Sequence, residues 1–280
     1  MKKHSGDSRN QHGPATPLIA LDTIVLDTET TGLDVRQDRL VQIAAVRLHG
    51  VDIIEHDVFN VLLDPGVPIP EVATRIHGIS DKDVAGKQTF PAIAPELAAF
   101  IGDAVVIGHS IHFDMAVFRH EAQRHGLVWR EPHAVDVGLV AAGLQPGLVD
   151  TSLDSLAAGL GITISGRHSA LGDAMATAKV YVALVPQLLA AGVRSLGEID
   201  TLCRKPGDLI ARQGNAGWFE RPGGRPDFTP RSLRSGAQKA IDSFLYRHRL
   251  GEVMSSPPIT VSRHVSLYEA ARLMTDRGIG

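Results

Sequence analysis

Three segments near the N-terminus have the pattern of consecutive strands. Residues 22–31 include the apolar run Ile24-Val25-Leu26, residues 39–49 alternate apolar and polar positions, and residues 52–63 follow a turn at Gly50. Alternation with a period of two is typical of strands, and short connections favour antiparallel neighbours. The pattern therefore predicts an antiparallel meander that ends at the turn over 64–66.

The next segments alternate between helical and strand patterns. Apolar residues recur at helical spacing over 90–101, and residues 104–107 are wholly apolar, as in a strand buried on both faces. The further predicted elements are a helical turn at 71–76, a helix near 113–125, a strand at 134–137, a short helix capped by Ser152 and a helix from Ala170 to about Leu189. This order predicts an α/β fold with a mixed five-stranded sheet flanked by helices.

Glycine and proline dominate the chain after residue 203. Their density over Arg204–Arg234 argues against a regular element of any length, so we interpret residues 191–250 as a Gly/Pro-rich linker with a helix over 237–249. Residues 201–250 hold ten Lys and Arg against four Asp and Glu. We favour a solvated linker for this basic segment, and a dedicated nucleic-acid arm is the alternative.

Composition narrows the class of protein. Of 280 residues, 44% are hydrophobic and 21% are charged, and the net charge is −3, as in globular domains. The single cysteine, Cys203, excludes an intrachain disulfide and a cysteine-based zinc site, which fits a cytoplasmic location. Residues 1–19 are predicted to be a disordered tail without a signal peptide. No apolar run approaches the roughly 20 residues of a membrane span, so no membrane partner is expected.

Two carboxylates follow the apolar run of the first strand. Asp27 and Glu29 lie on the same face of a strand, about 7 Å apart. Two carboxylates at the end of a core strand are costly to ionise without a counter-charge, and a divalent cation is the usual one. The alternative is a polar strand end that leads into a glycine turn.

Two later segments add the same kinds of side chain. Ile107-Gly-His-Ser-Ile-His-Phe-Asp114 joins a strand to a helix, and His168-Ser-Ala-Leu-Gly-Asp173 opens another helix. With these segments the sequence resembles the DEDDh-type 3′–5′ exonucleases, the group that includes the epsilon subunit of DNA polymerase III and ribonuclease T. His77-Gly78-Ile79 matches a further segment of that family. The resemblance covers roughly residues 20–190 and implies a ribonuclease-H-like fold for this exonuclease domain.

The resemblance also implies a metal site and a general base. The expected cofactor is a pair of Mg²⁺ ions, for which Mn²⁺ could substitute. By resemblance, Asp27 bridges both ions, Glu29 and Asp173 complete the site that holds the nucleophilic water, and Asp114 serves the other ion. His168 is the expected general base, since an unperturbed imidazole accepts a proton near pH 6.5.

Several neighbours of these residues are expected to contact substrate. Leu33 could wedge against a terminal base, and Thr28 and Thr30 could offer backbone or hydroxyl contacts to the terminal sugar. His77 and Ile79 match a segment that packs near the 3′-terminal nucleotide in the family. A simple turn is the alternative for His77 and Ile79. Ser110 stands where the family usually has Asn, which puts fine substrate positioning in doubt.

Residues 251–280 resemble the opening of a cystathionine-β-synthase (CBS) domain. The matching features are Val253-Met-Ser-Ser-Pro-Pro, a short strand, and then Ser266-Leu-Tyr-Glu-Ala-Ala. One strand and one helix cannot bury a core, so we expect a truncated domain belonging to a longer protein. An ordinary C-terminal helix after a proline-rich turn is the alternative. The resemblance implies an adenosine nucleotide as a partner of the full-length protein.

The leading prediction is a metal-dependent 3′–5′ exonuclease. It would hydrolyse phosphodiester bonds at the 3′ end of single-stranded nucleic acid, with DNA favoured over RNA, and release nucleoside 5′-monophosphates. The alternative is a regulatory, nucleotide-sensing protein in which the exonuclease fold is a binding scaffold coupled to the CBS module.

Overall fold

The central strand of the sheet carries the first acidic motif. The computed structural model describes residues 12–219, and in it β1 (Asp22–Thr30) lies in the middle of a five-stranded sheet of order β3-β2-β1-β4-β5. The other strands are β2 (Leu40–His49), β3 (Asp52–Leu62), β4 (Val105–Gly108) and β5 (Ala134–Asp136). Pairing is antiparallel between β1, β2 and β3 and parallel between β1, β4 and β5. The predicted mixed sheet is confirmed.

Five of the described helices begin and end close to the predicted residues. The structure contains a 3₁₀ turn η1 (Leu18–Ala20) and the helices α1 (Glu71–His77), α2 (Asp81–Val84), α3 (Phe90–Ile101), α4 (Ile111–Arg124), α5 (Val137–Leu144), α6 (Leu153–Gly159), α7 (Ala170–Ala190), α8 (Leu196–Cys203) and α9 (Gly207–Asn215). Within the described residues, the sequence pattern missed α2, α5, α8 and α9.

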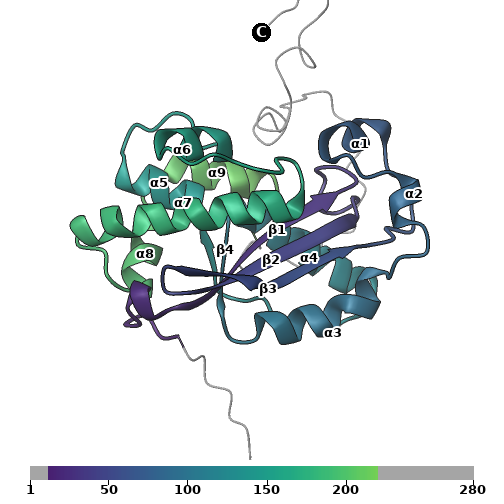
Figure 1. The fold of residues 1–280 in the computed structure, drawn as a ribbon, viewed down its shortest axis with the longest axis horizontal. Helices are drawn as coiled ribbons and strands as arrows, with labels where there is room; N and C mark the ends of the chain where they lie inside the picture. Colours follow the sequence, from purple (N-terminus) through teal and green to yellow (C-terminus); the bar gives the residue numbers. More distant parts are fainter. Residues whose placement is uncertain (1–11, 220–280) are drawn as a thin grey trace, which may run out of the picture. The chain divides into compact units, whose positions relative to one another are not determined.

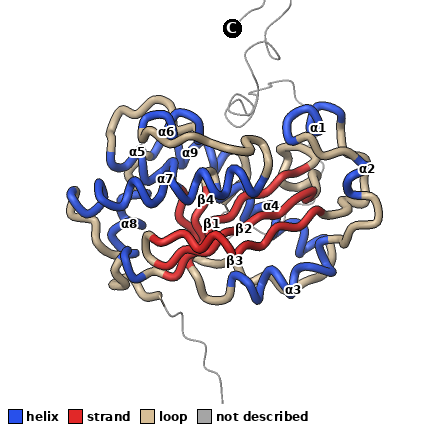
Figure 2. Tube along the Cα trace, in the orientation of Figure 1, coloured by secondary structure: helices blue, strands red, loops and turns tan. Residues whose placement is uncertain are grey.

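Helices cover both faces of the sheet, and the alternation of β1 decides which residues they meet. Val25 and the α7 side chains share one apolar cluster, whereas Ile24 and Leu26 share another with α3 and α4. Figure 1 shows α7 running across one face, with α4 behind the strands, and Figure 2 shows the strands as one layer between helices. Odd-numbered positions of β1 therefore face α7, and even-numbered positions face α4.

The predicted linker is wrong in its first part, because α8 and α9 belong to the packed domain. Leu196, Ile199 and Leu202 of α8 are buried in the cluster beneath α7. In α9 the Gln213 side-chain amide donates a 2.9 Å hydrogen bond to the carboxylate of Asp136. The glycines and prolines of this segment lie between and at the ends of short helices, where they are tolerated.

The predictions for the two ends of the chain are tested only in part, because the structure describes residues 12–219. The expected tail over residues 1–19 is wrong at its end, because Leu18 is fully buried and its amide donates to the Arg194 carbonyl at 2.9 Å. The expected helix at 237–249 and the CBS-like segment at 251–280 lie outside the described residues. Within residues 12–219, no helix has both the length and the apolar character that a membrane crossing requires.

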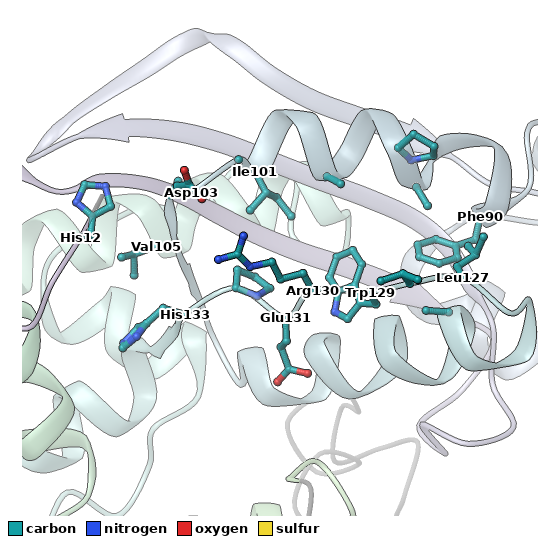
Figure 3. Close-up of a pocket in the computed structure, with 18 residues that line it drawn as sticks. His12, Phe90, Ile101, Asp103, Val105, Leu127, Trp129, Arg130, Glu131 and His133 are labelled. Carbon is teal, nitrogen blue, oxygen red and sulfur yellow. The ribbon is translucent and has the colours of Figure 1, made fainter. Parts of the chain in front are cut away.

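A pocket of about 550 Å³ lies between α3, the end of α4 and the segment 127–133. Trp129, Arg130 and Glu131 line it on one side (Figure 3). Of the described residues around this pocket, none is among the five predicted catalytic residues. The candidate chemistry therefore lies elsewhere, where β1 ends.

Candidate active site

The end of β1 places two carboxylates toward α7. Asp27 and Glu29 occupy the odd-numbered face, and both are buried. The pairing with β2 is irregular between Glu29 and Thr30. The residue skipped in this pairing is Val41 of β2, and such irregularities often lie beside active sites. The predicted common face of the D-x-E motif is confirmed.

The third carboxylate comes from the first turn of α7. Ser169 caps this helix by accepting a hydrogen bond from the Gly172 amide at 3.2 Å. A Cβ atom on Gly172 would lie 2.0 Å from the Gly166 carbonyl oxygen, so glycine lets the preceding loop fold back onto the helix. Asp173 follows directly, where the partial positive charge of the helix N-terminus favours a carboxylate.

These two elements meet at one cluster. One carboxylate oxygen from each of Asp27, Glu29 and Asp173 lies within 4.8 Å of the other two, and all three residues are buried. Like charges at that separation destabilise one another unless a cation neutralises them. An all-oxygen donor set of this kind fits a hard divalent cation such as Mg²⁺ or Mn²⁺.

Asp114 approaches from the opposite face of the sheet. It lies in the first turn of α4 and is 2% exposed. Its carboxylate accepts a 2.5 Å hydrogen bond from the hydroxyl of Thr28, which lies on the even-numbered face of β1. Within the described residues, Asp114 stands outside the group of three carboxylates. Thr28 therefore links Asp114 to the strand that carries the cluster.

Thr28 and Thr30 use their hydroxyls within the chain. The Thr28 side chain is fully buried and its hydroxyl donates to Asp114, and its expected contact with a sugar, through backbone or hydroxyl, stays a prediction. The hydroxyl of Thr30 is likewise donated within the chain, to the Gly32 carbonyl at 2.5 Å. The structure gives both threonine side chains a role in holding the end of β1.

His168 lies in the loop that leads into α7. It is half-buried and has a φ of 63°, in the left-handed region. Within residues 12–219, Ser110 at the start of α4 is the other non-glycine residue with positive φ. Such a conformation costs roughly 1–3 kcal/mol and persists where the surrounding structure enforces it, often at functional sites. Asparagine tolerates it better than serine does, which gives a backbone reason for the family's Asn at position 110.

The remaining expected substrate residues lie in the interior or next to it. Ile79 is 8% exposed and packs in a small cluster with Val41. His77 is also buried, and its Nδ1 accepts a 3.0 Å hydrogen bond from the Ile79 amide. Leu33 is half-buried against the cluster beneath α4. Their contact with a nucleotide stays a prediction.

Two residues near the cluster, Gln42 and Arg167, were not predicted from the sequence. Gln42 is paired with Glu29 across the strands, and its side chain accepts a 3.2 Å hydrogen bond from the Ala170 amide at the start of α7. Arg167 contacts Asp173 and also Asp154. A signal for Gln42 existed, because it is a polar residue within the apolar stretch Leu40–Val46. Asp136 caps α5 by accepting hydrogen bonds from the amides of Gly138 and Leu139.

A mixed sheet with carboxylates gathered between its central strand and a covering helix defines an α/β protein with a candidate divalent-cation site. The chain belongs to the exonuclease family, because the sequence profile of that family, described as "Exonuclease", matches residues 24–181. A second profile, that of the CBS domain, matches residues 250–280. Both resemblances recognised in the motifs are confirmed.

Relatives and solved structures agree with this assignment. A DNA polymerase III subunit epsilon-like protein of Rhodobacter capsulatus is 38% identical over 198 residues, which are 70% of this chain and 28% of that protein. The DNA polymerase III subunit epsilon of Aquifex aeolicus is 34% identical over 166 residues, which are 59% of this chain and 81% of that protein.

A crystal structure of Escherichia coli exonuclease I in complex with a dT13 oligonucleotide has the same fold. It shows a TM-score of 0.54 and 20% identity, over 61% of this chain and 42% of that one. This chain thus spans less than a third of the length of the Rhodobacter protein and less than half of exonuclease I.

Proposed function

We propose that this chain is a metal-dependent 3′–5′ exonuclease that removes nucleoside 5′-monophosphates from the 3′ end of single-stranded DNA by a two-metal mechanism. The observation that carries the proposal is the meeting of Asp27, Glu29 and Asp173 within 4.8 Å, from two elements far apart in the sequence. Membership of the exonuclease family supports the reaction class.

The carboxylates would hold the cations. Asp27, Glu29 and Asp173 supply oxygen ligands from one pocket, and Asp114 would serve the second ion from the start of α4. When bound, Mg²⁺ or Mn²⁺ would acidify a water molecule and neutralise charge on the phosphoryl group. Thr28 would keep the Asp114 carboxylate oriented through its hydrogen bond.

The remaining chemistry is proton transfer. His168 would accept the proton of the attacking water at an imidazole nitrogen, since a neutral imidazole is available near pH 7. The strained backbone at His168 and the cap by Ser169 fix the loop directly before Asp173. The loop therefore places the proposed base directly before the helical turn that carries the third carboxylate.

The substrate follows from the relatives. Two of them are named as epsilon or epsilon-like subunits of DNA polymerase III, and the exonuclease I structure holds a dT13 oligonucleotide. Single-stranded DNA is accordingly the proposed substrate. A cytoplasmic location, which the single cysteine favours, stays a prediction.

The test is digestion of a 5′-labelled single-stranded DNA with Mg²⁺ or with EDTA, beside an RNA of the same sequence. Stepwise shortening from the 3′ end, mononucleotide products and loss of activity in EDTA are expected. Asp27→Ala should abolish cleavage while circular dichroism stays unchanged, and Glu96→Gln, an exposed change on α3, should behave as wild type. Substantial Mg²⁺-dependent activity in folded Asp27→Ala would remove the metal assignment.

The CBS match favours a second, regulatory function in addition to catalysis. CBS-type sequence at residues 250–280 supports a proposal that an adenosine nucleotide binds this region of the full-length protein. Adding AMP or ATP to the digestion should change the rate if the two functions are coupled. Nucleotide binding without any cleavage by the wild-type chain would support the scaffold alternative instead.

A further inference from the structure

Arg167 connects the carboxylate cluster to a fourth acidic residue. Its Nε and Nη2 donate to the two carboxylate oxygens of Asp154 in α6, each at 3.0 Å. Its third nitrogen, Nη1, donates to Asp173 Oδ2. The Arg167 side chain is 22% exposed and that of Asp173 is 8% exposed, so this contact is largely shielded from water.

The geometry of the two contacts is complementary. A guanidinium is planar, and a bidentate carboxylate pair on one edge fixes the direction of the remaining nitrogen. Asp154 thereby aims Nη1 at Asp173 and holds a permanent positive charge beside a cluster of three carboxylates. The hydrogen bond from Arg167 also lowers the pKa of Asp154 below its usual value, which keeps the anchor ionised.

We infer that Arg167 is a positioning residue and a built-in counter-cation, which orients Asp173 through its contact with Oδ2 and competes with a divalent cation for the charge of the carboxylate cluster. This inference rests on the proposed metal site. Arg167 stabilises the metal-free cluster, and it opposes metal binding because a guanidinium and a divalent cation repel each other at short range. Asp154 retains the guanidinium at the site through its two other hydrogen bonds.

A purely structural role for Arg167 would have a different effect on metal affinity. If Arg167 only tied the 161–169 loop to α6, its loss would loosen Asp173 and weaken metal binding. If Arg167 is a counter-cation, its loss tightens metal binding while the metal-free protein becomes less stable. The direction of the change in affinity therefore separates the two roles.

The test measures Mn²⁺ affinity by calorimetry, and thermal unfolding with and without Mn²⁺, on the full chain. Arg167→Gln should bind Mn²⁺ about tenfold more tightly or better, because even a small part of the short-range repulsion is worth a decade in affinity. In EDTA it should melt lower than wild type, and Mn²⁺ should raise its Tm by more. Asp154→Asn should bind Mn²⁺ more weakly, because the freed guanidinium can turn fully onto the cluster.

Arg119→Gln is the matched control. Arg119 also forms a bidentate pair, with the carboxylate of Glu131 at 2.8–3.0 Å, and this pair lies outside the carboxylate cluster. The Arg119→Gln variant should therefore bind Mn²⁺ with the affinity of wild type. If Arg167→Gln does not fold, Arg167→Lys takes its place and should also bind more tightly than wild type, because an ammonium group lacks the fork that contacts both carboxylates.

Unchanged or weaker affinity in the Arg167 variant overturns the inference, and it leaves the proposed function standing as long as wild type binds Mn²⁺ and Asp27→Ala does not. Absence of Mn²⁺ binding by wild type overturns the metal site itself and this inference with it.

Discussion

Replacing Ile199 by alanine tests whether α8 belongs to the core of the exonuclease domain. Ile199 is 1% exposed and lies in the apolar cluster beneath α7. Replacing a buried isoleucine by alanine lowers the free energy of unfolding by about 2–5 kcal/mol, because apolar burial is lost and a cavity remains. For a domain of this size the loss corresponds to a fall in Tm of about 4–20 °C.

The matched control is the same chemical change at an exposed site. Ile19 in η1 is 62% exposed, so Ile19→Ala should change the free energy of unfolding by no more than about 0.5 kcal/mol. Urea unfolding followed by circular dichroism measures both variants. Equal midpoints for Ile199→Ala, Ile19→Ala and wild type would show that α8 contributes nothing, as in the linker interpretation.

Shortening the chain extends the same reasoning. A protein that ends at Gly192 loses Leu196, Ile199 and Leu202 together and exposes the surfaces of α5 and β5 that α8 covers. A protein that ends at Phe219 keeps them. The shorter protein should aggregate or melt well below the longer one, and equal Tm values would refute the packing argument.

Three further outcomes follow from the site and its surroundings. His168→Ala should lower turnover by about 10²–10⁴-fold while Mn²⁺ affinity persists; lost affinity in calorimetry would place His168 among the ligands. Gly172→Ala should lower both activity and Tm, because its Cβ would collide with the Gly166 carbonyl; unchanged kinetics would contradict that contact. Burial of the thiol raises the pKa of Cys203 to about 12, and the negative charges of Asp136 and Asp200 nearby act in the same direction. The thiol should therefore resist iodoacetamide at pH 8.5 until urea unfolds the domain; rapid labelling of the native protein would contradict this.

The raised pKa of Cys203 also gives a direction for stability. The folded state favours the neutral thiol of Cys203. The contribution of this thiol to the free energy of unfolding is therefore complete below the pKa near 8.5 that a cysteine has in the unfolded chain, and it declines as the pH rises toward about 12. Cys203→Ser should flatten the fall in Tm above pH 9, which a series of melting curves measures.

The sequence determined the local elements and the chemistry. Periods of two and of about 3.6 placed β1 to β3, α3 and α7 within a few residues, because each pattern reflects one buried face. The acidic motifs could be read in order, since each sits where an apolar run ends. The helices α8 and α9 escaped, because helices of eight and nine residues among glycines and prolines carry little periodicity and are stabilised by tertiary packing.

Only the tertiary structure decided which of these residues meet. Asp27 and Glu29 reach Asp173 because they share the face of β1 that α7 covers, whereas Thr28, one position along the strand, reaches Asp114 on the other face. The contacts of Arg167 with Asp154 and Asp173 likewise depend on how α6 packs beside α7. Side-chain type is local information, but distance between segments far apart in the chain is set by which faces bury each other, and that is a property of the whole fold.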